Sequence, residues 1–298
     1  MSDLLQYLVA GISLGAVYAL VSIGFVTIYK STGVINFAQG GFVVLGAFVA
    51  HELRVVRGMP FEVAVLGAML AMALLGALLE RVILRPLVGK PTFSVTMVSL
   101  GLLIILEQVG SATWGYDPVL VGDPWGITTV SIGSVMVKVA DLWTIAAAAV
   151  VLAALWSFFT YSVRGVAMRA TANDAEAALA QGIGAGAVYG VAWALAAAIA
   201  GLAGVLLATG SRGVDITLGA IALRAFPAMI LGGLDSPSGA VAGGLIIGVT
   251  EVLAAGYLTP HAPWLGANVH VVAPYLVMLL VLVVRPYGIA GTGEVRRV

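Results

Sequence analysis

Three ionisable side chains lie inside strongly apolar runs of the sequence. Glu107 occurs in LLIILEQVG, Arg224 in IALRAFPAM and Glu251 in IIGVTEVLA. A charge at the centre of a membrane costs about 2.5–3.5 kcal/mol, so each group must face a partner or a water-filled cavity rather than lipid. Two interpretations stay open. The residues line a pathway for a polar solute, or Arg224 forms a structural ion pair with Glu107 or Glu251.

Another apolar run, residues 34–50, begins with polar residues and adjacent glycines in the sequence VINFAQGG. Irregular backbone at membrane depth is tolerated only where it is buried in protein or lines a cavity. We therefore expect Gly40 and Gly41 to interrupt a helix inside a bundle. Asn36 and Gln39 then either satisfy the freed backbone groups or face a solute.

Enzymatic motifs are weak or absent. GISLG at residues 11–15 fits G-x-S-x-G but lies in an apolar run rather than at a strand-to-helix turn. A small-residue packing face is the favoured interpretation. An intramembrane hydrolase with Ser13 as nucleophile and His270 as base is the alternative. HELRV at 51–55 lacks the second histidine of H-E-x-x-H, and no P-loop occurs, so we assign no catalytic residue and no metal ligand.

The composition is that of a polytopic membrane protein. The 298 residues are 61% hydrophobic and 9% charged, with a mean hydropathy of +1.10. Soluble domains have about 45–50% apolar and about 25% charged residues. The formal net charge is zero, which gives no indication of a nucleic-acid partner. We expect an all-α transmembrane helix bundle that forms a single domain over residues 1–298.

The spans follow from length, because about 20 residues at 1.5 Å each cross the hydrocarbon layer. The sequence predicts eight or nine, at residues 4–28, 34–50, 61–80, 94–113, 140–160, 187–209, 218–233, 237–256 and 270–285. The second is broken by NFAQGG. Residues 218–233 contain Arg224 and Pro227, so this segment is expected to be interrupted or re-entrant. The loops richest in Lys and Arg place the N-terminus outside and the C-terminus inside.

A polar stretch at about residues 161–186 is the longest on the inner side. Asn173 with Glu176 three residues later fits a capping arrangement, and Gly182 can end a helix. These features predict a short amphipathic helix over residues 173–183. Such a helix rests on lipid headgroups or inserts into a groove on a cytoplasmic partner.

Four segments occur in this order along the chain: GVINFAQGGFVVLGAFVA, ERVILRPLVGKP, RGVAMRATANDAEAALAQGI and LGGLDSPSGAVAGGLIIGVTE. On these segments the chain resembles the LivH-like permease subunits of branched-chain amino acid ABC importers. The resemblance extends from about Leu14 to Tyr287. It implies a multi-pass permease of the bacterial cytoplasmic (inner) membrane that translocates leucine, isoleucine and valine.

The resemblance also implies partners. They are a second, LivM-like permease, two cytoplasmic ATPases that bind ATP and Mg, and an external solute-binding protein. This chain itself holds no cofactor. EAALAQG at 176–182 matches the start of the family's coupling motif, E-A-A-x-x-x-G, although the usual Leu-Pro continuation is missing. The resemblance assigns the ATPase contact to Arg164, Arg169, Asp174, Glu176, Leu179 and Gly182.

One departure leaves the solute open. Family members often carry His or Gln followed by Gly-Glu in the second span, whereas here Gly40 and Gly41 follow Gln39. Related permeases are associated with urea, short amides and small organic acids. A stand-alone secondary transporter is the next alternative, with an intramembrane ionisable group carrying a proton or ion. The predicted pathway residues are Asn36, Gln39, Gly40, Gly41, Glu107, Arg224 and Glu251.

Overall fold

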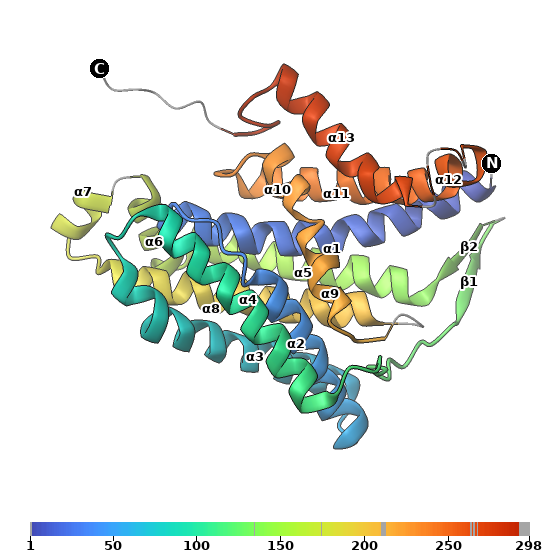
Figure 1. The fold of residues 1–298 in the computed structure, drawn as a ribbon, viewed down its shortest axis with the longest axis horizontal. Coiled ribbons are helices and arrows are strands. Elements are labelled where there is room, and N and C mark those ends of the chain that lie inside the picture. The colour runs from blue at the N-terminus through green and yellow to red at the C-terminus, as the bar shows by residue number, and fades with distance from the viewer. Residues whose placement is uncertain are drawn as a thin grey trace. The chain divides into compact units, whose positions relative to one another are not determined.

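The computed structural model describes residues 2–133, 135–173, 175–209, 213–262, 264, 266 and 268–291. Helices make up most of these residues, and β1 with β2 is their only sheet (Figure 1). The elements are α1 (Ser2–Thr32), α2 (Gln39–His51), η1 (Glu52–Val56), α3 (Phe61–Leu79), η2 (Glu80–Leu84), η3 (Arg85–Leu87), α4 (Thr92–Trp114), β1 (Thr129–Ile132), β2 (Val135–Lys138), α5 (Val139–Tyr161), α6 (Val163–Asn173), α7 (Ala175–Ala180), α8 (Ala185–Ala208), α9 (Thr217–Leu223), α10 (Phe226–Gly232), α11 (Pro237–Leu253), η4 (Ala254–Leu258), α12 (Thr259–His261) and α13 (Val269–Val284).

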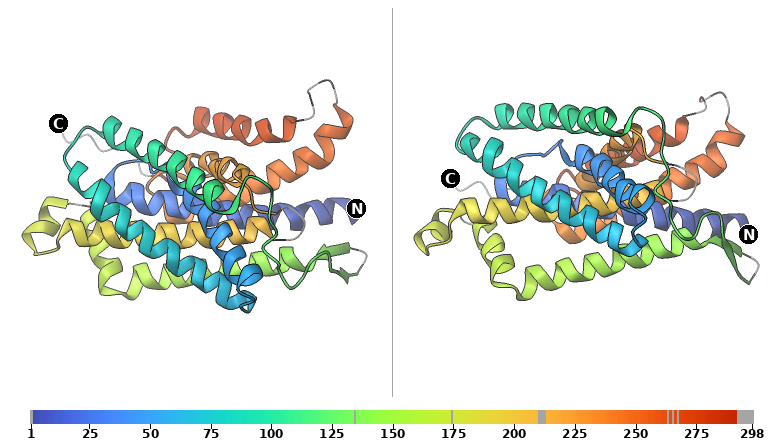
Figure 2. Two further views of the ribbon diagram at one scale, coloured as in Figure 1. Left: turned by 60° about the horizontal axis from the view of Figure 1, so that its bottom comes forward. Right: turned by 90° about the horizontal axis from the view of Figure 1, so that it is seen from below.

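The expected all-α polytopic bundle is confirmed. Among the described residues, seven helices are long and apolar enough to cross a membrane. Two further predicted spans are shorter apolar helices, at Thr217–Gly232 and Val269–Val284. The first of these is interrupted as expected, because α9 ends at Leu223 and α10 begins at Phe226. The antiparallel hairpin β1–β2 was not predicted, and it leads directly into α5 (Figure 2).

The chain divides into two compact units. Unit 1 comprises residues 1–26, 127–148 and 224–298, and unit 2 comprises residues 27–126 and 149–223. The long helices α1 and α5 each contribute to both units.

Helix α2 is the core of unit 2. Its residues from Gln39 to Phe48 are all buried, and it packs against α3, α4, α8 and α9. A helix that is apolar on all sides is stable only when other helices surround it. Helix α2, with the sequence QGGFVVLGAFVAH, is of this apolar kind, since it carries no Asp, Glu, Lys or Arg.

Helix α3 shows how small residues select the packed face. Its buried row, spaced every four residues, is Ala64, Ala68, Met72 and Gly76. Its exposed row at the same spacing is Leu66, Leu70, Leu74 and Leu78. Small side chains let helix backbones approach closely in a membrane, whereas leucine is as well accommodated by lipid as by protein. The buried row therefore meets α8, and the leucine row lies exposed on the other side of the helix.

Close backbone contact between α2 and α8 yields a testable prediction. A Cβ atom on Gly204 would collide with the carbonyl oxygen of Val43, whereas one on Gly101 of α4 would meet open space. We expect Gly204→Ala to lower the free energy of unfolding by about 1–3 kcal/mol through overpacking. The matched variant Gly101→Ala is expected to be neutral or slightly stabilising, because alanine favours helix. Thermal unfolding in detergent measures both, and equal melting temperatures would contradict the prediction.

Unit 1 also depends on glycines. A Cβ atom on Gly15 of α1 would lie 2.8 Å from the Cα atom of Leu245, and one on Gly244 of α11 would lie 2.5 Å from the nitrogen of Ala19. GISLG is therefore a packing face inside a continuous helix. Ser13 and His270 share no hydrogen bond in the part of the chain that the structure describes, so the hydrolase alternative gains no support.

One local expectation was wrong, and one needs an addition. Gly40 and Gly41 do not interrupt a helix, because the irregular segment ends before them and α2 begins at Gln39. The short helix predicted within residues 173–183 is α7 (Ala175–Ala180), and a separate helix that was not predicted, α6 (Val163–Asn173), precedes it. Ser162 caps α6, since its Oγ accepts the backbone N–H of Gly165 at 2.9 Å.

Candidate functional site

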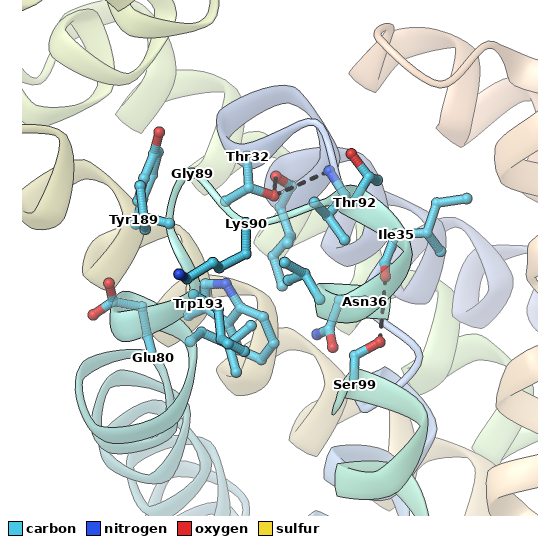
Figure 3. A pocket seen from close by; sticks show the side chains of 16 residues that line it. Thr32, Ile35, Asn36, Glu80, Gly89, Lys90, Thr92, Ser99, Tyr189 and Trp193 are labelled. Atoms are coloured by element: carbon cyan, nitrogen blue, oxygen red, sulfur yellow. Dashed lines mark hydrogen bonds between the residues drawn. The ribbon is translucent and has the colours of Figure 1, made fainter. Parts of the chain in front are cut away.

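Unit 2 contains a cavity of about 170 Å³ at one end of its helices. Its walls come from the end of α1, the irregular segment before α2, the π-helical turn η2, the loop after η3 and the first turns of α4 and α8 (Figure 3). The volume exceeds the roughly 30 Å³ that one water molecule occupies in the liquid. The cavity therefore has room for a small organic solute.

Hydrogen bonds hold the irregular segment that forms one wall. Asn36 Oδ1 accepts the backbone N–H of Ala38 at 3.0 Å, and Ser99 Oγ of α4 accepts that of Phe37 at 3.2 Å. Asn36 and Ser99 are each 1% exposed. Of the two roles predicted for Asn36, the structure shows a bond to a freed backbone group and also a position on the cavity wall.

Another wall of the cavity includes a buried acid that pairs with a partly exposed arginine. Glu80 is 1% exposed, and its carboxylate accepts two hydrogen bonds from Arg85, from Nε at 3.2 Å and from Nη2 at 2.8 Å. The five-residue spacing follows from the π-helical turn, in which the Arg85 N–H bonds the Glu80 carbonyl. Arg85 Nη2 also donates to the carbonyl of Gly186 at 2.8 Å. The pair thus joins η2 to the first turn of α8.

Gln39 does not line this cavity. Its Nε2 donates to the carbonyl of Ala196 in α8 at 3.0 Å, and the residue is fully buried. A Cβ atom on Gly40 would lie 3.1 Å from the carbonyl oxygen of Gly219, and one on Gly41 would lie 2.7 Å from the Cβ of Leu106. These two glycines let α9 and α4 approach α2.

Glu107 is close to this glycine contact. Its Oε1 occupies the space that a Cβ atom on Gly219 would take. The carboxylate has no hydrogen bond or ion pair among the described residues. The contact between α2, α9 and α4 therefore involves two glycines, Gly40 and Gly219, and the carboxylate of Glu107, which has no partner among the described residues.

Arg224 and Glu251 meet in unit 1. Arg224 Nη1 lies 2.9 Å from Glu251 Oε1, and Tyr18 donates its hydroxyl to Glu251 Oε2 at 2.6 Å. Ser22 Oγ donates to the carbonyl of Ala225 at 3.0 Å, in the turn between α9 and α10. Of the two partners predicted for Arg224, the structure selects Glu251. The role of the pair in a pathway stays a prediction.

The predicted coupling segment comprises α6, α7 and the turn that follows. Gly182 has φ +83° and ends α7, with the N–H of Ile183 bonded to the carbonyl of Ala178. Arg164 and Arg169 are exposed on α6. Asp174 lies outside the described residues, as do the side chains of Glu176 and Leu179. Met168 of α6 forms a buried cluster with residues 188 and 192 of α8, so α6 is packed against the same helix that lines the cavity.

The model of a family described as "Branched-chain amino acid transport system / permease component" matches residues 7–282. The chain belongs to this permease family. The resemblance deduced from the four sequence segments is thereby confirmed, and the permease is a multi-pass membrane transport subunit.

Curated relatives align with the permease from end to end. The protein named "High-affinity branched-chain amino acid transport system permease protein LivH" of Salmonella typhimurium is 32% identical over 309 residues, which covers 99% of this chain and 97% of that protein. The protein of the same description named BraD, from Pseudomonas aeruginosa, is 30% identical and covers 99% and 98%. A solved structure, "PsaBC from Streptococcus pneumoniae in complex with Fab", has a TM-score of 0.50 at 17% identity over 93% of this chain and 90% of that one, and supports the fold alone.

The predicted pathway residues of the permease fall into separate groups. In unit 2, Asn36 lies at the cavity, while Gln39, Gly40, Gly41 and Glu107 lie deeper around α2. Sequence reasoning placed Glu80 at the end of the predicted span 61–80 but gave it no role. An acid at the end of an apolar run with an arginine five residues later was the available signal, but it indicates a pair only if the turn is π-helical.

Proposed function

We propose that the permease is one membrane subunit of an ATP-driven importer for branched-chain amino acids. An external binding protein delivers the solute, a second permease completes the pathway, and two cytoplasmic ATPases supply the energy. This chain contributes helices and binds no nucleotide. The end-to-end relationship to LivH and BraD supports the solute class, since both are described as branched-chain amino acid permeases.

One structural observation carries the mechanism. Helix α8 is shared by the coupling segment and the cavity: Met168 of α6 packs on its first turns, Gly186 accepts Arg85, and Tyr189 and Trp193 line the cavity. A displacement of α6 and α7 by an ATPase therefore acts on the cavity wall through packed side chains. Nucleotide binding shifts the conformation only if the two nucleotide states bind the conformations with different affinity.

The importer class has a direct test. The permease is purified with its partner subunits, reconstituted in proteoliposomes and assayed for uptake of radiolabelled leucine. We expect uptake only with ATP on the ATPase side and with the binding protein on the other side. Uptake by the purified chain alone, driven by an ion gradient, would instead establish a secondary transporter. Competition with urea, acetamide and short organic acids tests the solute class.

The coupling assignment predicts a specific glycine effect. Gly182 requires a left-handed backbone, with φ +83°, whereas Gly184 has φ −70° and open space around it. Alanine is strained at the first position and unstrained at the second. We expect Gly182→Ala to reduce ATP-dependent uptake while membrane insertion is retained, and Gly184→Ala to transport like the wild type. Normal uptake by Gly182→Ala would show that the turn does not transmit the motion.

A further inference from the structure

We propose that the unit 2 cavity binds the carboxylate of a small apolar acid, and thus serves as an internal site for the transported amino acid. This inference rests on the proposed function and goes beyond it, because it names the carboxylate as the chemical group that the cavity recognises. It selects acids over the urea and short amides that the sequence had left open.

A buried hydrogen-bond donor indicates what the cavity lacks. Asn36 Nδ2 is buried and has no hydrogen-bond partner among the residues that the structure describes. The orientation of its amide is fixed, because Oδ1 accepts the N–H of Ala38 and Nδ2 must be the other atom. Buried polar groups in folded proteins nearly always have partners. In the view of Figure 3, the Asn36 amide and the Lys90 side chain lie on either side of Trp193, and all three line the cavity. A ligand acceptor is therefore the missing partner of Nδ2.

The charge around the cavity favours an anion. Lys90 is exposed, and its ammonium has no ion-pair partner in the described part of the chain. Thr92 starts α4, which has no side-chain cap and no acid in its first turn. A free helix N-terminus attracts negative charge. Glu80, the one acid among the described residues that line the cavity, is already paired with Arg85. The polar groups left to contact a ligand in the cavity are therefore mainly positively charged groups and hydrogen-bond donors.

The remaining walls fit an aliphatic tail. Ile28, Leu84 and Val95 line the cavity together with the ring of Trp193. Pockets for small ligands are mostly apolar and have a few placed polar groups that fix orientation. A carboxylate directed at Asn36 and the start of α4 leaves a branched chain against these apolar walls, and the Lys90 ammonium adds positive charge to the same cavity.

The probes for the test are 4-methylpentanoate and 4-methylpentanamide, which differ only in the carboxylate. Binding to the purified transporter complex is measured by calorimetry in detergent, with and without added phosphatidylglycerol. We expect the acid to bind at least about tenfold more tightly than the amide, as befits hydrogen bonds to a charged group. Equal binding of acid and amide, or loss of the acid's binding when phosphatidylglycerol is added, would overturn the proposal; the second result would assign the cavity to a lipid headgroup.

Matched variants locate the site. Asn36→Asp keeps the oxygen that accepts the Ala38 N–H but replaces the free donor with a negative oxygen, and Lys90→Gln removes the cation. We expect each to weaken binding of the acid by about tenfold or more. Lys138→Gln, a change at an exposed lysine of the β hairpin, is expected to leave binding unchanged. Unaltered binding by Asn36→Asp contradicts the inference.

The two proposals fail separately. ATP-driven leucine uptake by a complex that binds acid and amide equally would refute the carboxylate site and leave the importer intact. Selective acid binding that depends on Asn36, by a complex that shows no ATP-driven uptake, would refute the proposed function and leave the site.

Discussion

Replacing Arg224 with methionine is expected to lower the free energy of unfolding by about 3 kcal/mol. The Glu251 side chain is 7% exposed, and Arg224 is its only ion-pair partner among the described residues. Removing the guanidinium leaves a buried carboxylate without a counter-charge, which is far costlier than losing an exposed ion pair. The effect lies at the lower end of the usual range because Tyr18 still donates to this carboxylate. Thermal unfolding in detergent measures the change.

The control is the double variant Arg224→Met with Glu251→Gln, which removes both charges and keeps an acceptor for Tyr18. It should recover most of the lost stability. Arg164→Met, at an exposed arginine of α6, should have little effect. The double variant also decides between the two interpretations of the sequence. Normal transport by a stable double variant means that the pair is purely structural, and a stable protein that fails to transport assigns it to the pathway.

Replacing Arg85 with methionine is expected to reduce ATP-driven uptake by about tenfold, within the range of coupling energies between two sites. Arg85 both neutralises Glu80 and holds the carbonyl of Gly186, so it connects the π-helical turn η2 to the first turn of α8. Without it, a motion of the coupling segment is no longer passed to the cavity wall. The ratio of solute transported to ATP hydrolysed measures the loss.

Two matched variants make this prediction specific. Arg85→Lys keeps the charge but not the two-pronged hydrogen bonding, so it should be intermediate. Arg57 forms the same five-residue pair with Glu52 across the π-helical turn η1, but the Glu52 side chain is 28% exposed, compared with 2% for Glu80. Arg57→Met should leave transport nearly unchanged. Equal losses of transport in Arg57→Met and Arg85→Met would show that the effect comes from removing a positive charge, and that the hydrogen bond from Arg85 to α8 has no specific role.

Membrane character, span positions and family all follow from the amino-acid sequence without the fold. Hydropathy over about 20 residues is a local property, so span positions can be read without knowing any contact. Local stereochemistry also predicted the interruption of the segment that holds Arg224 and Pro227, and the helix end at Gly182. Both depend on residues within one or two turns.

Only the tertiary structure decided which residues meet. The choice of Glu251 over Glu107 as the partner of Arg224 depends on helices distant in sequence. The same holds for Gly40 and Gly41, which let neighbouring helices approach and do not break their own helix. Glu80 is the clearest case. A helix of 3.6 residues per turn does not bring residues five apart to one face, so periodicity concealed its pair with Arg85 until the π-helical turn was known. The cavity likewise exists only because the start of α8 packs beside Asn36 and Lys90, which no local pattern encodes.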